Sequence, residues 1–133
     1  MASITILPKN QQQPSGGKPL IAKLMGFQQA LALNHWLTTS YAQHKALGQA
    51  YEDMADKLDG FVETLIGVKG RNVIANITTL DVGGNVQSIL NGIEAVLRND
   101  IPAMVGPNET ALLNLRDDML DLVQHTRYLL TLG

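Results

Sequence analysis

Hydrophobic residues recur at steps of three and four along four stretches of the chain. This spacing puts them on one face of an α-helix, so it predicts four amphipathic helices that begin near residues 19, 41, 85 and 108. Alternation of the β type is almost absent. The predicted inward-facing residues are Leu20, Leu24, Phe27 and Leu31; Leu47, Tyr51, Ala55, Leu58, Val62 and Leu65; Val86, Ile89, Leu90, Ile93, Val96 and Leu97; and Leu112, Leu115, Met119, Leu122, Thr126 and Leu129.

The boundaries of the first two helices are marked by residues that favour helix ends. Pro19 suits the first helical position, and the helix should end near Leu37. Ser40 and Gln43 have the spacing of a capping box, in which the Ser40 hydroxyl accepts from the Gln43 backbone N–H and the Gln43 side chain reaches back. The second helix should then begin after Ser40 and stop at Gly67.

A glycine-rich segment at residues 67–84 separates these two helices from the last two, and a short helix is expected within it around Val73–Ile77. Pro102 should kink or end the third helix, and Asn108 is a good N-cap for the fourth. Short, long and short connections between four helices predict an all-α, ferritin-like four-helix bundle with a long connection between its second and third helices.

The first 17 residues have the composition of a tail. Residues 11–17 are Gln, Pro, Ser and Gly, which offer nothing to pack in a core. Residues 4–7 are Ile-Thr-Ile-Leu, which could add to a partner surface as a short strand or plug. The predicted organisation is therefore a tail at residues 1–17 and a single bundle domain at residues 18–133.

Composition removes several classes of function. The chain has 133 residues, a formal net charge of -2 and no cysteine. Disulfides, thiolate catalysis and cysteine-type zinc sites are excluded, and a general electrostatic attraction to nucleic acid is absent. We find neither an apolar run of about 20 residues, as a membrane span requires, nor a signal-peptide layout. We expect a protein of the cytoplasm or the virion, without a membrane or nucleic-acid partner.

Two histidines and two carboxylates are the candidate chemistry. His35 falls at the end of the first predicted helix and His44 in the first turn of the second, which also carries Asp59 and Glu63 one turn apart. Such a ligand set suits iron, and also zinc or manganese. The two carboxylates lie with Glu52 on the edge of the apolar face, where they would meet a neighbouring helix or a neighbouring subunit. A metal site between subunits is therefore one hypothesis.

Structural explanations of the same residues stay open. His44 lies within an apolar face, where a hydrogen-bonded core histidine is common. His35 and Trp36 could cap the first helix and fill the core, and the carboxylates could form a solvated stripe. His125 is expected to be structural or exposed. No nucleophile elbow or nucleotide fingerprint is present, so we predict no catalytic side chain.

The order His35-Trp36, His44, Asp59, Glu63 resembles the Dps miniferritins, and the resemblance extends over most of residues 19–132. It implies iron binding and Fe(II) oxidation, hence a ferroxidase, at a site shared between subunits of a homo-oligomer. At such a site Trp36 would pack beside the metal. Glu52 would support the metal ligands or act as an auxiliary one, because it lies two turns before Asp59 on the same edge of the helix. The chain departs from these proteins in the shorter link between the two histidines and in lacking a strongly basic tail.

A second resemblance lies in the sequence motif of residues 35–45, which is His-Trp-x-Thr-x-Ser-Tyr-x-x-His-Lys. This stretch is similar to a family of small helical proteins of phages and large viruses. The function of that family is unknown, but a viral source would favour a different class of function, a structural or interaction protein that holds no metal. The tail would then dock on another viral or host component.

Overall fold

The computed structural model describes residues 17–133, with side chains from Pro19 onward. Its α-helices are α2 (Gly17–Leu37), α3 (Tyr41–Lys69), α4 (Val86–Ala95), α5 (Ile101–Val105) and α6 (Thr110–Leu130). A 3₁₀ turn, η2 (Arg71–Val73), follows α3, and a π-helical segment, η3 (Val96–Asp100), joins α4 to α5. Within residues 17–133 there is no strand, so the all-α prediction is confirmed.

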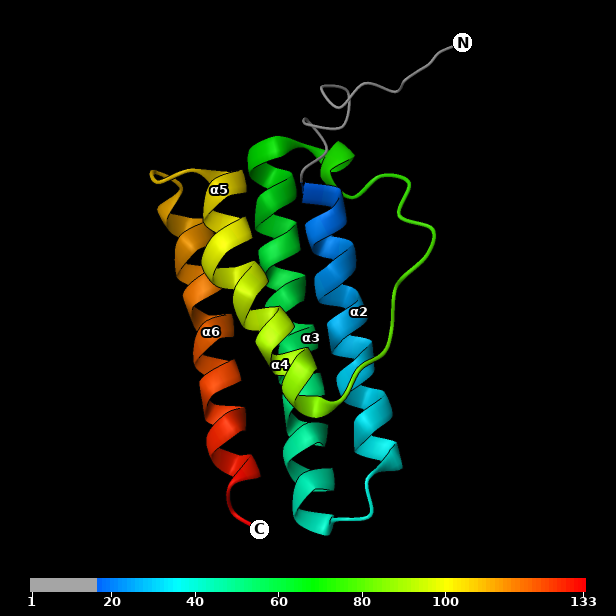
Figure 1. The fold of residues 1–133 in the computed structure, drawn as a ribbon. Coiled ribbons are helices and arrows are strands. Elements are labelled where there is room, and N and C mark those ends of the chain that lie inside the picture. Colours follow the sequence, from blue (N-terminus) through cyan, green and yellow to red (C-terminus); the bar gives the residue numbers. More distant parts are fainter. Residues whose placement is uncertain (1–16) are drawn as a thin grey trace.

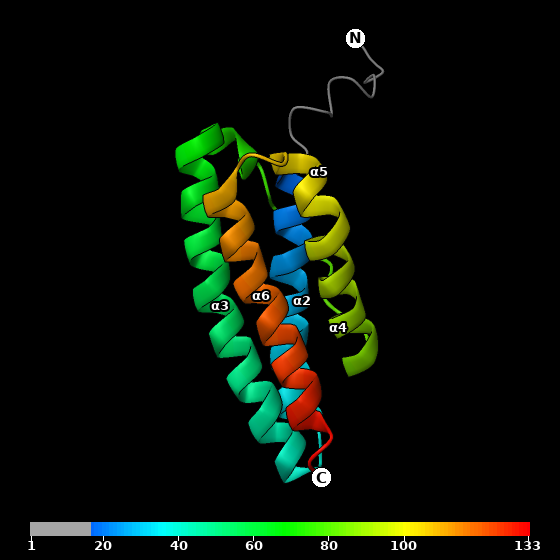
Figure 2. The same ribbon diagram turned by 90° about the vertical axis from the view of Figure 1, so that its left-hand side faces the viewer.

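The helices form a bundle with one long crossover. In Figure 1, α2 and α3 are antiparallel neighbours. The segment after η2 returns along much of the bundle, so that α4 starts short of the α2–α3 turn and runs parallel to α3. Helix α6 runs back beside α3 and ends next to the α2–α3 turn. Figure 2 shows that α3 and α4 lie on opposite sides, with α2 and α6 between them. Three helix ends therefore meet at one end of the molecule.

The core is built from the predicted apolar faces, with two shifts. Most of the residues with almost no exposed surface belong to the predicted set. On α3, however, Met54 and Phe61 are buried and Ala55 is exposed, so the buried face is rotated slightly from the predicted one. On α2 the buried face also includes Ile21.

Some helix ends agree with prediction, namely Leu37, the Ser40 cap and the start after Asn85. Helix α3 continues past Gly67 to Lys69, because Gly70 is the glycine that takes a positive φ (91°), and its N–H donates to the Ile66 carbonyl. The remaining corrections are a start of α2 at Gly17 instead of Pro19, a 3₁₀ turn at Arg71–Val73 instead of a helix at Val73–Ile77, and Glu109 instead of Asn108 before α6.

Pro102 neither ends nor sharply interrupts the third helical rod. The rod widens to π geometry just before it, and the Ile101 N–H donates to the Val96 carbonyl five residues back. Pro102 has no N–H, so in this register the Leu97 carbonyl loses its helical partner. Arg116 of α6 supplies one, since its Nη1 donates to the Leu97 oxygen at 3.0 Å. Arg116 of α6 therefore completes the backbone bonding of another helix.

A polar cluster joins α4 to α6 further along. Arg127 donates to the Glu94 carboxylate at 2.9 Å, and also to Gln87 and Asn91. Arg98 donates to the other Glu94 oxygen at 2.7 Å. Hydrogen bonds from Arg98 and Arg127 hold the pKa of Glu94 below its ordinary value. Because the cluster is partly exposed, it contributes little to the free energy of unfolding, and we infer that its main role is to orient α4 relative to α6.

The pairing of Arg116 with the Leu97 carbonyl predicts a defined loss on mutation. Arg116→Met keeps an apolar stem but leaves a carbonyl without its donor, so we expect the free energy of unfolding to fall by about 1–3 kcal/mol in urea melts. In a Pro102→Ala background the residue at 102 has its own N–H for Leu97, and the same change should cost clearly less. Equal costs in both backgrounds would contradict this account.

Candidate functional site

His35 and His44 form a reciprocal pair at the turn between α2 and α3, which we call the histidine clasp. The His35 Nδ1 lies 2.6 Å from the His44 carbonyl oxygen, and the His44 Nδ1 lies 2.8 Å from the His35 carbonyl oxygen. The two rings stack, with centroids 3.9 Å apart and planes 15° from parallel. Both predicted histidines are therefore brought together within one chain.

The clasp fixes the tautomer of each ring. A carbonyl oxygen only accepts, so each Nδ1 carries the proton and donates, and each Nε2 of the neutral ring carries a lone pair. The His35 carbonyl lies in the last turn of α2, where carbonyls lack a helical partner. The His44 ring of α3 thus caps the end of α2 by donating to one of these carbonyls.

The short link between the helices supports this geometry. The Ser40 hydroxyl accepts from the Gln43 N–H at 3.2 Å, which confirms the predicted N-cap. The other half of the predicted capping box is wrong. The Gln43 side chain accepts from the Thr38 hydroxyl, which itself accepts from the Ser40 N–H. Thr38 competes successfully because the tight turn places its hydroxyl between the two groups.

A glycine makes room for the clasp. A Cβ placed on Gly48, in the second turn of α3, would lie 2.7 Å from His35 Cε1 and 2.9 Å from its Nδ1. No other residue type fits there without displacing the ring. Tyr51 covers the next turn, with its ring centroid 5.6 Å from that of His35.

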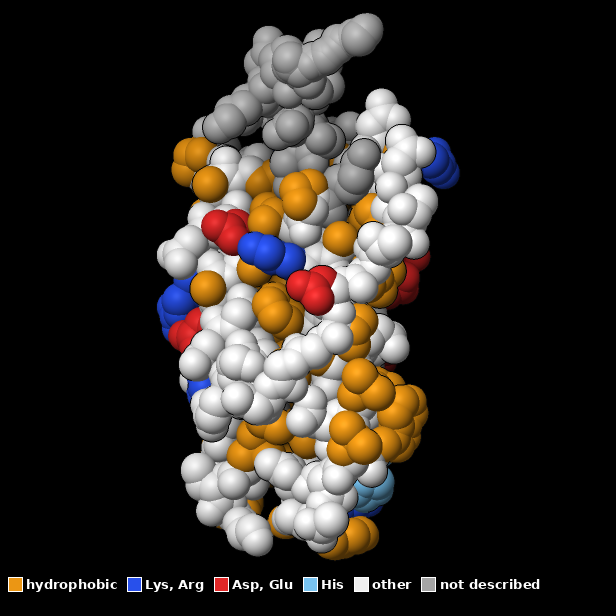
Figure 3. Space-filling view, turned by 45° about the vertical axis from the view of Figure 1, so that its right-hand side comes forward, with side chains coloured by type: hydrophobic (Ala, Val, Ile, Leu, Met, Phe, Trp, Pro, Cys, Tyr) orange, Lys and Arg blue, Asp and Glu red, His pale blue; other side chains and the backbone are white. Residues whose placement is uncertain are grey.

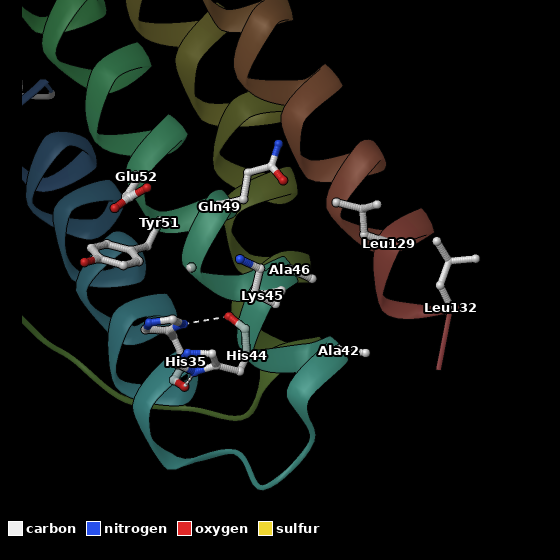
Figure 4. A pocket seen from close by; sticks show the side chains of 11 residues that line it. His35, Ala42, His44, Lys45, Ala46, Gln49, Tyr51, Glu52, Leu129 and Leu132 are labelled. Atoms are coloured by element: carbon white, nitrogen blue, oxygen red, sulfur yellow. Dashed lines mark hydrogen bonds between the residues drawn. The ribbon is translucent and has the colours of Figure 1, made fainter.

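Beside the clasp lies a groove of about 530 Å³. Figure 4 shows His35, His44 and Tyr51 along one side, and Leu129 of α6 and Leu132 just after it along the other. The first turns of α3 form the floor between them. The remaining lining residues include the small Ala42, Ala46 and Gly48, and the polar Lys45, Gln49 and Glu52.

The predicted carboxylates do not join the histidines in one chain. Asp59 and Glu63 are exposed and lie about 22 Å and 28 Å along α3 from His44, at 1.5 Å per residue. Asp59 lines a second groove, of about 460 Å³, beside Ile21 and Val62. Glu52 is the only predicted auxiliary residue that lines the same groove as the histidines. Across residues 17–133, no three potential metal ligands cluster.

The stacking limits what the clasp can ligate. A metal bound to imidazole lies in the ring plane, about 2.0–2.1 Å from the nitrogen. Since the two planes are stacked and nearly parallel, an ion in one plane lies outside the other. One ion therefore takes one imidazole, unless a ring rotates and gives up its carbonyl.

Trp36 is not in the core. Its side chain is 64% exposed, and its ring centroid is 6.4 Å from that of His35. It belongs to a set of exposed hydrophobic residues around the three meeting helix ends, which we call the apolar end. In Figure 3 hydrophobic side chains gather in the lower half of the molecule, next to a histidine. The residues of the apolar end are Leu33, Trp36, Leu37, Tyr41, Tyr128 and Leu132.

Sequence reasoning missed this surface. Tyr41 and Leu37 are both 75% exposed, and both lie within the stretch of residues 35–45 that was interpreted for its histidines. The sequence did contain a signal for it. Trp36, Leu37 and Tyr41 flank a turn of three residues, which is too short to cover their side chains, so they could have been predicted to be exposed. His125 is exposed, as predicted.

A family model described as a family of unknown function (DUF5856) matches residues 35–130, well over half of the chain. The chain belongs to this family. It is also similar to the "Uncharacterized 14.6 kDa protein in mobD-ri intergenic region" of Enterobacteria phage T4, with 28% identity over 122 residues, 90% of this chain and 91% of that protein. No solved structure matches.

These findings support the second resemblance, to small helical phage proteins of unknown function, and not the miniferritin resemblance. The family match covers residues 35–130 and so includes the clasp, every lining residue of the groove except Leu132, and most of the apolar end. None of the described helices is long and apolar enough to cross a membrane.

The clasp predicts opposite effects for two glycines of α3. Gly48→Ala should force the His35 ring away and lower the free energy of unfolding, although alanine favours helix. Gly60→Ala is the matched control, because nothing lies within 4 Å of its Cβ position, and it should raise stability by about 0.5–1 kcal/mol. Thermal melts of both variants measure the difference. A stabilised Gly48→Ala would show that the ring is not held there.

Proposed function

We propose that this chain is a non-catalytic interaction protein of a bacteriophage, whose helical bundle presents the apolar end to a protein partner. The relatives support the phage setting, since the chain belongs to the DUF5856 family and is similar to a phage T4 protein. The tail at residues 1–17 was expected as a docking segment. Its residues 1–16 lie outside the described part of the chain, and Gly17 is already the first residue of α2.

One observation carries the proposal, the concentration of exposed apolar side chains at one end. Among the described residues, eight large hydrophobic side chains are exposed, and all but Val68 and Val82 belong to the apolar end. Trp36, Tyr41 and Tyr128 are at least 59% exposed. Exposed hydrophobic patches mark interaction sites, and tryptophan and tyrosine contribute most where partners bind.

The backbone is suited to this role. The clasp and the Ser40 cap hold both ends of the three-residue turn, so Trp36 and Tyr41 are displayed on a fixed scaffold. A rigid display lowers the ordering cost of binding. No chemistry needs to be assigned to the exposed rings.

The proposal predicts that the two aromatic residues hold the partner. The tagged chain, expressed in host cells infected with its own phage, should co-purify with a stoichiometric partner. Trp36→Ser/Tyr41→Ser should weaken that complex by roughly thirtyfold or more, because the loss of even one contact at a binding centre costs about 2 kcal/mol.

The matched control is Val68→Ser/Val82→Ser, which removes the two exposed hydrophobic residues outside the apolar end. It should retain the partner at the wild-type yield. Since all four residues are exposed, both variants should fold normally. Equal retention by the two double variants, or no partner with the wild type, would refute the proposal.

A second candidate function is metal binding at the clasp within a ferritin-like, one-crossover bundle. The observation that favours it is the Nδ1–carbonyl pairing, which leaves both Nε2 lone pairs free. Metal-ligating histidines are commonly oriented in this way. In this hypothesis one imidazole, with Glu52 beside it, meets Asp59 and Glu63 of a second subunit and holds iron, zinc or manganese. Oxidation of Fe(II) would require such a complete site.

For this candidate we expect calorimetry with Fe(II), Zn(II) or Mn(II) to show about one ion per chain for the wild type. Asp59→Asn should then weaken binding at least tenfold, because it removes a charged ligand. Asp118→Asn, which changes an exposed carboxylate of α6, is the control. If the wild type binds none of the three ions, or if both variants bind alike, the metal hypothesis fails while the interaction hypothesis stands.

A further inference from the structure

The outer face of α3 carries a single line of exposed residues. They recur every three or four positions, so they lie along one side of the helix. All of them are exposed to solvent, although α3 is packed against α2 and α6 on its other sides. The line consists of Tyr41, Lys45, Gln49, Glu52, Asp56, Asp59 and Glu63.

Charge on this line is divided at Gln49. On the N-terminal side the only charge is the Lys45 ammonium, and on the C-terminal side every residue is a carboxylate. None of these side chains takes part in an ion pair among the described residues. When two copies of such a surface face each other in antiparallel orientation, the positive half of each lies against the negative half of the other.

The spacing defines where a two-fold axis would cross the helix. Lys45 and Glu52 are equally far from the midpoint between Gly48 and Gln49, and so are Tyr41 and Asp56. An antiparallel pair of α3 helices about this point therefore sets each Lys45 against the Glu52 of the second copy and each Tyr41 against its Asp56. A symmetric interface repeats each contact twice. The two Gln49 amides meet near the axis, where each can donate to the other.

The shape of this region also suits an approaching helix. The groove of about 530 Å³ surrounds the same midpoint, and its lining includes Lys45, Gln49 and Glu52. Small side chains, Ala42 and Ala46, lie on its floor. Leu129 of α6 and Leu132, which follows that helix, form one wall (Figure 4). Small residues in a groove let two helix backbones come close.

We propose that the occupant of this groove is a second copy of the chain, which pairs through α3 in antiparallel orientation about the Gly48–Gln49 midpoint. The charges favour a second copy over an unrelated helix. A partner must offer carboxylates to Lys45 and a cation to Glu52, and a second copy of the same line offers both. The inference goes beyond the proposed function and does not rest on it. Tyr41 and Leu132 of the apolar end lie at this interface, whereas Leu33, Trp36 and Leu37 belong to the end of α2 and stay free to meet a different protein.

The test uses the full chain in sedimentation equilibrium across a dilution series. The wild type should dimerise, and Lys45→Glu or Glu52→Lys alone should raise the dimer dissociation constant by about tenfold or more, since each replaces two attractions by two repulsions. An equimolar mixture of these two variants should dimerise again, because like charges at the interface of each variant alone are replaced by opposite charges in the mixed pair. The double variant Lys45→Glu/Glu52→Lys should also dimerise.

Lys69→Glu is the matched control, since it changes net charge as Lys45→Glu does but lies at the far end of α3. It should dimerise like the wild type. A wild type that stays monomeric at every concentration overturns the inference. A dimer that responds equally to Lys45→Glu and Lys69→Glu, or a mixture that does not recover, also overturns it. None of these results bears on capture of a partner through Trp36, which lies on α2 outside this line.

Discussion

Two reciprocal hydrogen bonds at one turn determine how the first helix pair is set. Each histidine of the clasp donates to the backbone of the other helix, so α2 and α3 are joined through main-chain atoms and cannot slide past each other without breaking both bonds. The stacked rings then require a glycine at position 48 and bring Tyr51 over them. The groove, the apolar end and the exposed line of α3 all follow from this register.

The fold was largely predictable because it depends on periodic burial. Leu47, Leu58 and Leu65 lie where a 3.6-residue repeat puts them. Errors arise where tertiary contacts decide. Ala55 and Phe61 differ from prediction because neighbouring helices select the buried side of a long helix. The end of α3 depends on which glycine adopts a positive φ, and a sequence with glycines at 67 and 70 does not distinguish them.

The sequence predicted which two histidines form the site, but it did not predict how they are bonded. The pattern singled out His35 and His44, and they do meet. Their bonding to backbone carbonyls, however, depends on a three-residue turn whose geometry the side-chain types do not specify. Trp36 could have been buried or exposed on sequence grounds, because a large aromatic residue at a helix end packs only if the next helix returns over it. A contact between Asp59 and a histidine would have to form between two chains. The hydrophobic periodicity of one chain does not predict contacts between chains.

The proline of the third rod also has a consequence for how the protein folds. A segment spanning α4 to α5 cannot satisfy the Leu97 carbonyl by itself, because the missing donor comes from Arg116 in α6. Local helix formation and docking of the last helix are thus thermodynamically coupled, and the rod gains its full stability only when the C-terminal helix is in place. Such coupling makes unfolding more cooperative, since detachment of the C-terminal helix removes both its packing and the donor of the Leu97 carbonyl.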